Sequence, residues 1–578
     1  MGERAGFIQS LFFGTIDTEL LQPFPTYSNE KREEVRAIVD MVRRFTQEQI
    51  DPVAIDRNHQ IPESVKKGMS ELGLWGIIIP EEYGGFAQPE VTYNKVMEVL
   101  TGTCGSTSVT YGAHLSIGLK AILLFGTDEQ KREFLPALSS GEKFAAFALT
   151  EPGAGSDNLS MTTTAEESED GTYYILNGRK QWITNGGFAE VFTVFARVKK
   201  HGEASADASK ITAFIVTRDI PGFSSGKEED KLGLCGSSTT SLYLDNVKVP
   251  AKNILGQIGG GFKVAMEVLN TGRLGLGAGC VGAAKAILKP AIQFALQREQ
   301  FGCRIADFDL IKEMFARSLI NTFTGESMVY YTTYLKESPD LSVALEAAVC
   351  KIFSSEALWQ TVNDCLQIAG GNGFMKDYPF ERFLRDTRIN MIFEGTNEIL
   401  RMMVATTGLM KSSIHLKKHM NELSPMSEEI REKRIEELVQ QTIHSGEQFS
   451  IPGYSPTLEE QLTLLSRLTH QFQQAVVRTV LRQGRALREK EIILRRITDA
   501  VIDLYGMYAN VVRVENLIRN NHHSAENALL MSRIFAFDAE RRIRANLVSL
   551  DMNCDADMVK AAELLYKTER YPFDILDY

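Results

Sequence analysis

The sequence predicts a mainly helical protein with a β domain in the middle of the chain. Three observations predict this class. Apolar residues recur at helical spacing in residues 30–145, short strand-like segments fill residues 146–257, and helical spacing returns from residue 258 onward. The chain has 578 residues, of which 44% are hydrophobic. That length suggests about three or four domains.

An N-terminal helical domain is expected over residues 30–145, after an N-terminal extension of residues 1–29. In the run EKREEVRAIVDMVRRFTQEQI, apolar residues follow helical spacing and the run ends before Pro52. A second helical run, IPESVKKGMSELGLWG, leads into the turn PEEYGG, and a third covers Thr107 to Phe125.

A β domain is expected over residues 146–257. Its segments KFAAFAL, TYYILNG, VFTVFARV, ITAFIVTR and SLYLDNVKVP are short, rich in β-branched or aromatic residues, and separated by turn residues. No helical pattern lies between them. Such spacing predicts an antiparallel sandwich or barrel.

Helices are expected again after the β domain, in two groups. Residues 258–410 read as a helical bundle, with helices over roughly 260–300, 308–336, 341–369 and 394–408. Residues 411–457 read as a linker with one amphipathic helix, because they include Ser424-Pro425 and Pro452-Gly-Tyr-Ser-Pro456. Residues 458–578 carry two further helical stripes and read as an extra C-terminal helical domain.

Composition and charge exclude several classes of function. The net charge is −11 and no Lys/Arg block is large enough to follow a phosphate backbone, so nucleic acid is not an expected partner. The seven cysteines form no CxxC pair, which indicates reduced thiols and neither a disulfide framework nor a metal site. No apolar run approaches the ~18–20 residues that span a bilayer. The first residues resemble neither a signal peptide nor a transit peptide, so no transit peptide is evident.

The first motif with chemical content is LTEPGAGSD, residues 149–157. Its glycines and proline form a tight loop with exposed backbone N–H groups, and Thr150 and Ser156 add hydroxyls. Such a loop can hold a polar ring edge or a phosphate, although an ordinary β-turn has the same composition.

The second motif is NGRKQWITNG, residues 177–186. After the turn at Asn177-Gly178, Trp182 and Thr184 lie two apart on a strand and face the same way. An aromatic plane beside a hydroxyl suits a flat heteroaromatic cofactor; the alternative is that Trp182 belongs to the core.

The third motif is IFEGTNEILR, residues 392–401, which follows QIAGGNGF and RD. Glu394 lies between apolar residues at an expected helix start. Apolar surroundings raise a carboxyl pKa toward the working pH, as a general base requires. The alternative is that Glu394 only occupies the first turn of a helix, where acidic residues are favoured.

Together these motifs resemble the acyl-CoA dehydrogenase family in order and spacing. PEEYGG, LTEPGAGSD, WITNGG, VKVPAKNILG, REQFG, GGNGF, RDTRI and FEGTNEILR are nearly identical to its motifs, and the resemblance covers about residues 30–408. The extra C-terminal helical domain resembles the very-long-chain branch. DYPFERFLRDTRI and IFEGTNEILRM resemble the member of that branch that also serves in respiratory complex I assembly.

The resemblance implies the family's fold: an N-terminal helical domain, a middle antiparallel β domain and a C-terminal four-helix domain, with FAD between them. It assigns Glu394 as the catalytic base. It assigns FAD contacts within one chain to Phe147, Leu149, Thr150, Trp182, Thr184, Thr396 and Glu398. It assigns contacts with the neighbouring subunit's FAD to Arg298, Phe301, Gln367, Gly370 and Gly371. Such contacts imply a homodimer. It places Ser156, Asn270 and Arg273 near the thioester arm and coenzyme A, although Asn270 stands where some relatives carry Asp.

The implied reaction converts an acyl-CoA into a trans-2-enoyl-CoA. Glu394 takes the pro-R α-proton while a hydride leaves the β-carbon for the flavin, and the Glu394 backbone N–H helps to stabilise the thioester oxygen. The resemblance implies electron-transferring flavoprotein as the electron acceptor and the matrix side of the inner mitochondrial membrane as the location. The alternatives are an acyl-CoA oxidase, which passes electrons to oxygen, and an assembly factor that binds complex I assembly proteins.

Two further expectations concern the substrate and the membrane. Ser108 and Gly112 lie four apart on one helix, where medium-chain relatives carry larger residues that close the acyl pocket, so a deep channel for long acyl chains is expected. The alternative is that the small residues only let two helices pack. Residues Glu428–Ile443 are the candidate for peripheral contact with the inner mitochondrial membrane, although their acids outnumber their bases, which is unusual for a membrane-surface helix.

Overall fold

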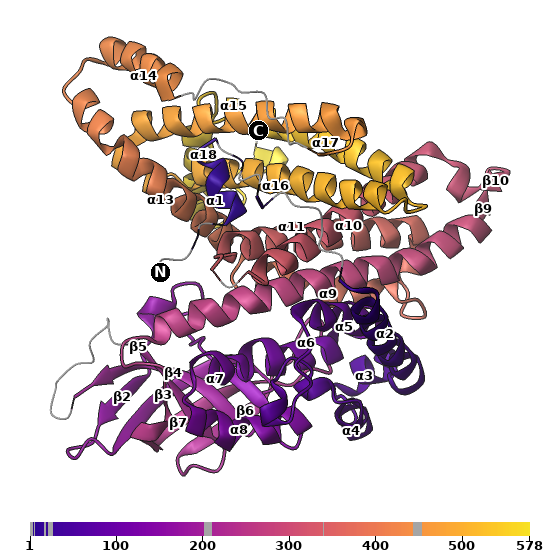
Figure 1. The fold of residues 1–578 in the computed structure, drawn as a ribbon, viewed down its shortest axis with the longest axis vertical. Helices are drawn as coiled ribbons and strands as arrows, with labels where there is room; N and C mark the ends of the chain where they lie inside the picture. The colour runs from indigo at the N-terminus through magenta and orange to yellow at the C-terminus, as the bar shows by residue number, and fades with distance from the viewer. Residues whose placement is uncertain are drawn as a thin grey trace. The chain divides into compact units, whose positions relative to one another are not determined.

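The computed structural model describes residues 4, 6–14, 16, 19–20, 27–200, 211–338, 340–442 and 453–577. It divides the chain into two compact units (Figure 1). The first consists chiefly of Phe24–Ile399, and the second of Ala5–Pro23 with Leu400–Tyr578. The mainly helical class with a central sheet is confirmed.

The first unit begins with helices. They are α2 (Asn29–Gln49), α3 (Pro52–Asn58), α4 (Glu63–Glu71), α5 (Glu90–Thr103), α6 (Gly105–Gly112), a π-helical segment (Ala113–Gly118), α7 (Lys120–Phe125) and α8 (Asp128–Ser140). Helix α2 starts where the Ser28 side chain accepts a hydrogen bond from the Lys31 N–H, as an N-cap residue does. The single helix expected over 107–125 is therefore three segments, and the π-helical turn lies in its middle.

This interrupted helix corrects one expectation about apolar runs. By length and composition Gly105–Phe125 could span a bilayer, contrary to the expectation that no apolar run is long enough. However, 67% of the apolar 18-residue window within it is buried inside the protein, as in a core helix. His114 in the π-helical segment accepts a hydrogen bond from the Ala145 N–H at Nδ1, and its Nε2 lies 3.1 Å from the Leu138 carbonyl oxygen. Burial lowers the pKa of His114 to about 4, so the ring is neutral and fastens this segment to the sheet.

The sheet follows in the chain. Its strands are β1 (Ala145–Ala148), β2 (Thr164–Glu167), β3 (Tyr173–Thr184), β4 (Val191–Lys199), β5 (Ile211–Thr217), β6 (Phe223–Glu228), β7 (Thr239–Pro250) and β8 (Ile254–Leu255). Their order is β6-β7-β3-β2-β4-β5-β8, with β1 also paired to β4. Most pairs are antiparallel as expected, but β4 pairs in parallel with both β1 and β2. Parallel pairs need crossover connections, which the spacing of turn residues does not reveal.

The remaining helices of the first unit pack side by side. They are α9 (Gly261–Gln297), α10 (Asp309–Lys336), α11 (Ala344–Ala369), α12 (Phe380–Thr387) and the start of α13 (Asn397–Leu423), with a hairpin of β9 (Glu299–Gln300) and β10 (Cys303–Arg304) after α9. Figure 1 shows this hairpin at the opposite end of α9 from the sheet. A helix of 37 residues is about 55 Å long, so α9 separates the two ends of the unit.

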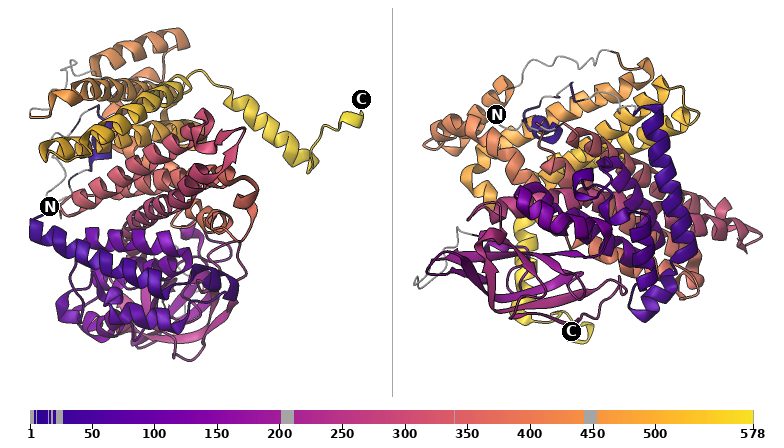
Figure 2. Two further views of the ribbon diagram at one scale, coloured as in Figure 1. Left: turned by 90° about the vertical axis from the view of Figure 1, so that its right-hand side faces the viewer. Right: turned by 60° about the horizontal axis from the view of Figure 1, so that its bottom comes forward.

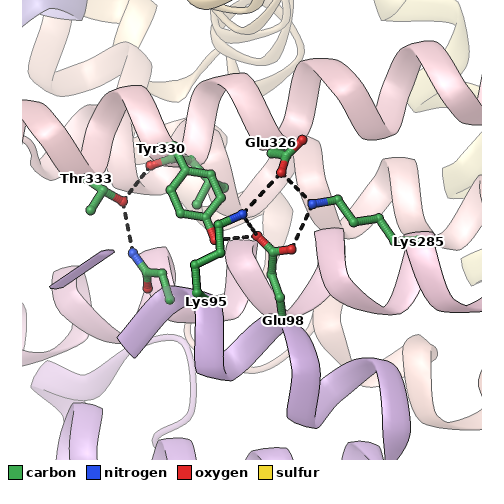
Figure 3. Close-up of polar contacts among 8 residues, drawn as sticks. Lys95, Glu98, Lys285, Glu326, Tyr330 and Thr333 are labelled. Atoms are coloured by element: carbon green, nitrogen blue, oxygen red, sulfur yellow. Dashed lines mark hydrogen bonds and ion pairs between the residues drawn. The ribbon is translucent and has the colours of Figure 1, made fainter. Parts of the chain in front are cut away.

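Charged residues join α5, α9 and α10 (Figure 3). Glu98 lies 3.0 Å from Lys95 and 2.8 Å from Lys285, and both lysines also contact Glu326. The hydroxyl of Tyr330 donates a hydrogen bond to Glu98. Because Glu98 is buried, these partners are needed to offset the cost of removing its charge from water.

The second unit is helical in the residues described. It contains α1 (Phe7–Leu11), most of α13, α14 (Glu428–Thr442), α15 (Glu459–Gln483), α16 (Glu491–Arg519), α17 (Ala525–Val548) and α18 (Asp555–Thr568). Phe7 of α1 is buried against Tyr505 and Tyr508, so part of the expected N-terminal extension belongs to this unit. Figure 2 shows α18 extending away from α15–α17, and no residue of α18 is buried.

The expected linker over 411–457 differs from the structure. Its first residues continue α13 to Leu423, and α14 packs against α15. Ile435, Leu438 and Val439 of α14 are buried, and Glu436 accepts hydrogen bonds from Arg478. Most of the apolar face that made α14 a membrane candidate is therefore already used within the unit, while Ile430 is exposed and Ile443 lies outside the described residues.

Candidate active site

Glu394 lies in a turn between a short helical turn (Arg388–Met391) and α13. It has a left-handed backbone conformation, with φ of 60°, which is strained for a residue with a side chain. Two cations hold this turn. Arg273 Nε donates to the Glu394 carbonyl at 3.2 Å, and Lys351 Nζ donates to the Gly395 carbonyl at 2.8 Å. Because α13 starts only at Asn397, Glu394 is not a first-turn helix residue.

The side chain of Glu394 is held in a low-polarity site. Its Oε2 atom is buried and has no hydrogen-bond partner among the residues described, although the residue as a whole is half-buried. Burial raises the pKa of Glu394 to about 7, while the charges of Arg273 and Lys351 oppose that rise. Burial also lowers the pKa of Lys351 to about 8. A carboxyl with a pKa near 7 can both accept and release a proton at neutral pH.

Helix α9 leaves room for this carboxyl at Gly272. A Cβ atom there would lie 2.9 Å from Glu394 Oε2 and 3.1 Å from the Ile117 side chain in the π-helical segment. Further along α9, a Cβ at Gly275 would lie 2.9 Å from the hydroxyl of Tyr93, which is buried and lacks a hydrogen bond within the described structure. The site therefore combines one carboxyl with mostly apolar or small neighbours.

The LTEPGAGSD loop leaves β1 and is fixed by a buried ion pair. Lys180 Nζ lies 2.7 Å from Glu151 Oε1 and donates to the Leu149 carbonyl at 3.2 Å. Glu151 also accepts from the N–H groups of Thr162 and Thr163. The Thr150 carbonyl accepts from the Gln181 N–H at 2.9 Å, so this loop and the second motif are joined directly.

The residues around this loop fit a flat cofactor. Phe147 and Leu149 are buried, whereas the side chain of Trp182 is 59% exposed. Trp182 has a φ of 57° and lies where the register of β3 and β7 shifts, so a bulge turns its ring outward. It is therefore not a core residue. Gly153 and Gly155 have open space where a Cβ would stand, so a ligand could approach the loop backbone closely.

The second set of expected cofactor residues lies at the other end of α9. Phe301 is 95% exposed, and Arg298, Gln367, Gly370 and Gly371 are exposed too. The rise of α9 from Gly272 to Gln297 is about 38 Å, so one chain does not bring this set together with Trp182. Thr396 and Glu398, in contrast, follow Glu394 directly.

The expected substrate residues fall in three places. Ser156 is exposed on the loop. Asn270 accepts from Arg273 Nη1 at 2.8 Å, and Arg273 is itself buried against the turn that carries Glu394. Ser108 and Gly112 are buried, and Ser108 lies in the wall of a cavity of about 40 Å³ between α5, α6, α9, α11 and α12.

Sequence reasoning missed Lys351, Gly272, Ile117 and Tyr93. Only Lys351 left a signal: it is a lysine within the apolar helical run ALEAAVCKIFSS, where a charge is unexpected. The others are ordinary core residues until the fold places them beside Glu394.

Comparison with known proteins decides the family. The acyl-CoA dehydrogenase N-terminal, middle and C-terminal domains match residues 32–142, 146–247 and 259–409, and the ACAD9/ACADV C-terminal domain matches residues 456–570. This chain belongs to the acyl-CoA dehydrogenase family. It is an oxidoreductase that acts on CH–CH bonds with a flavin.

Individual relatives of this acyl-CoA dehydrogenase support the same family assignment. The mitochondrial very long-chain specific acyl-CoA dehydrogenase of Homo sapiens is 37% identical over 560 residues, covering 95% of this chain and 84% of the relative. A crystal structure of an acyl-CoA dehydrogenase complexed with FAD from Bacillus anthracis has a TM-score of 0.80 at 34% identity, covering 98% and 96%. FAD is therefore the cofactor of this dehydrogenase.

One further structural relative concerns electron transfer. A structure of the electron transferring flavoprotein system of Acidaminococcus fermentans, which concerns flavin-based electron bifurcation, has a TM-score of 0.61 at 36% identity. It covers 65% of this acyl-CoA dehydrogenase and 97% of the other chain.

Proposed function

We propose that Glu394 is the base that removes the α-proton of a long-chain acyl-CoA. The observation that supports this most is the buried Oε2 atom without a hydrogen-bond partner in the described structure, on a carboxyl whose pKa is raised to about 7. An unpaired acceptor with that pKa is suited to take a proton from carbon. Arg273 and Lys351 act as positioning residues, since they hold the backbone of the turn and not the carboxyl itself.

The other residues of the site bind and orient. Bound FAD supplies the hydride acceptor for the substrate β-carbon. Phe147, Leu149, Thr150, Trp182 and Thr184 would hold it, together with Thr396 and Glu398. The Glu394 backbone N–H would stabilise the thioester oxygen as negative charge develops on it. Ser156 and Asn270 would contact the thioester arm and coenzyme A. The product is a trans-2-enoyl-CoA.

We infer a homodimer from the two distant sets of cofactor residues. Phe301 is too exposed and too far along α9 to serve the site of its own chain. Arg298, Phe301, Gln367, Gly370 and Gly371 would instead contact the FAD of the partner subunit. This arrangement gives a reason for an almost fully exposed phenylalanine, which a monomer would leave in water.

The small residues at Ser108 and Gly112 support a long acyl chain. Ser108 lies in the wall of a cavity that Leu276, Gly279 and Ala283 of α9 also line. The ideal Cβ at Gly112 meets only Met97 and Tyr93 at 3.5 Å or more. Larger side chains at these two positions would fill that space. A channel open past Ser108 accepts more methylene groups than one closed there.

The cellular setting belongs to the same proposal. The similarity to mitochondrial very long-chain enzymes supports a role in mitochondrial fatty acid β-oxidation, on the matrix side of the inner membrane, with electron-transferring flavoprotein as acceptor. The inner mitochondrial membrane, contacted peripherally, and complex I assembly proteins are further partners that we propose to test. The packing of α14 argues against that helix as the main anchor.

A substrate-length series tests the activity. Purified protein would be mixed anaerobically with saturated acyl-CoAs of increasing length and a ferrocenium acceptor. We expect flavin bleaching and enoyl-CoA formation, with the highest kcat/KM for long chains. Rapid formation of hydrogen peroxide in air would instead indicate an acyl-CoA oxidase, and the absence of bleaching by every chain length would contradict the proposed function.

A further inference from the structure

The cavity that Ser108 lines has both apolar and polar residues in its wall. Met97, Leu276, Leu358 and Phe383 contribute apolar surface, as expected for a space that receives an acyl chain. Four polar residues of α12 and of the turn that follows it also line this cavity: Arg382, Asp386, Thr387 and Asn390. A hydrocarbon chain alone needs no such groups.

Three of these polar side chains are buried yet unpaired. Arg382, Thr387 and Asn390 are 8%, 3% and 8% exposed. In the part of the chain that the structure describes, none of the three side chains makes a hydrogen bond or an ion pair within 4.0 Å. The guanidinium of Arg382 lies over the ring of Phe383, and its charge acts to lower the pKa of Asp386 and of Asp56. Buried polar side chains normally have partners, and these three line one cavity, so a polar group bound there could supply their hydrogen bonds.

Asp386 supplies the opposite charge. Its Oδ1 accepts from the Leu234 N–H at 2.6 Å, and its carboxyl lines the cavity. Asp386 and Arg382 are four residues apart on α12, but they form no ion pair within 4.0 Å in the described structure. Burial raises the pKa of Asp386 to about 6, so at neutral pH it is mostly an ionised acceptor that faces a cationic donor.

The cavity lies on the face of α9 that carries the base. Leu276, Gly279 and Ala283 line it, and they follow Gly272 by four, seven and eleven residues. Residues at those offsets share one side of a helix. Since Glu394 Oε2 lies against Gly272, an acyl chain that starts at the base and follows this face of α9 reaches the cavity after about 6–16 Å.

We propose that the end of this channel binds a hydroxyl group carried on the far end of a long acyl chain. The inference rests on the proposed function, because it takes the channel to begin at Glu394. The hydroxyl oxygen would accept a hydrogen bond from Arg382, and the hydroxyl group would donate one to Asp386. One neutral group would then be hydrogen-bonded to both charged side chains. A volume of about 40 Å³ suits a group of that size. A terminal carboxylate fits less well, because it would lie beside the carboxylate of Asp386.

The test compares acyl-CoAs that differ only at the far end. For each chain length, kcat/KM of the FAD-loaded enzyme would be measured for the methyl-terminated, ω-hydroxy and ω-carboxy forms. We expect the ω-hydroxy form to be preferred at the lengths whose end reaches the cavity, and no preference for shorter chains. A preference for the methyl or carboxylate end at every length would overturn the proposal.

Variants assign the preference to the cavity. Arg382→Met removes the donor at similar volume and should lower the ω-hydroxy to methyl ratio of kcat/KM at least about tenfold, the loss typical of a hydrogen bond to a charged group. Asp386→Asn is a second variant in case the first does not fold, and it should lower the same ratio. Arg388→Met is the control, because it removes a neighbouring guanidinium that does not line the cavity.

The outcomes separate the two proposals. If the Arg382 and Asp386 variants both keep the wild-type ratio, the cavity holds only ordered water and the inference is wrong. If no methyl-terminated acyl-CoA is dehydrogenated at any length, the proposed function itself fails. Thermal unfolding of each variant confirms that the ratios are measured on folded protein.

Discussion

Gly272 and Glu394 pack so closely that residue 272 has no room for a methyl side chain. A Cβ atom at Gly272 would lie 2.9 Å from Oε2 of Glu394, a distance that real Cβ contacts almost never show. The base and the long helix α9 are therefore matched in shape, and the absence of a side chain at residue 272 is part of the site.

The first prediction follows from this fit. Gly272→Ala should move the Glu394 carboxyl and lower the rate of flavin reduction by roughly 10²-fold, because misplacing a reacting group by about 1 Å has that effect. Anaerobic stopped-flow bleaching by a long-chain acyl-CoA measures it. Gly277→Ala is the matched control, since its Cβ would meet Val329 and not the base. Equal losses in both variants would mean that the helix and not the base was disturbed.

The second prediction concerns the base itself. Glu394→Gln keeps the size of the side chain but removes its ability to accept a proton. We expect folded protein with bound yellow FAD and at least about 10²-fold slower bleaching by acyl-CoA. Near-normal bleaching in this variant would show that another group removes the proton.

The third prediction concerns pH. Only the ionised form of Glu394 accepts a proton, and its pKa is raised to about 7, so the rate of flavin reduction should rise with pH through that value. Lys351 stabilises the ionised form, and Lys351→Gln removes this charge while leaving an amide donor for the Gly395 carbonyl. The midpoint of the pH profile should therefore move to higher pH. A midpoint that stays in place or moves lower would contradict this account of the electrostatics.

The fourth prediction concerns chain length. Ser108→Gln combined with Gly112→Glu would fill the space between α5, α6 and α9 and should shift the kcat/KM profile toward shorter acyl chains. Turnover of the shortest substrates serves as the internal control, because their chains do not extend to Ser108. If the double variant folds and its profile is unchanged, these small residues serve helix packing alone.

The fifth prediction concerns α14. Ile435 is fully buried, so Ile435→Ala should lower the free energy of unfolding of the second unit by about 2–5 kcal/mol. Ile430 on the same helix is exposed, and Ile430→Ala should change it by less than about 0.5 kcal/mol. Denaturant unfolding followed by circular dichroism measures both. Equal stability of the two variants would mean that α14 is not packed in solution, and liposome flotation would then be the next test.

Several features could be predicted from the sequence because they depend on short stretches of chain. Apolar spacing located the long helices, and α9 begins and ends within a few residues of the predicted range. Short strand segments located the central sheet. The motif around Glu394 indicated a buried acid, because neighbours such as Ile392 and Phe393 already suggest an apolar environment.

Other features depended on residues far apart in the chain, and only the tertiary structure decided them. Trp182 is exposed because a register shift against β7 turns it outward, and strand alternation alone does not reveal a bulge. Phe7 is buried among α16 residues some 500 positions away. The roles of Lys351, Gly272 and Arg382 depend on contacts with residues far away in the chain. The sequence by itself determined the long helices, the strand segments and the motifs that carry the chemistry, because periodicity and motifs are local. Burial, pairing and the pKa of Glu394 are properties of packed surroundings, so they exist only once the helices meet.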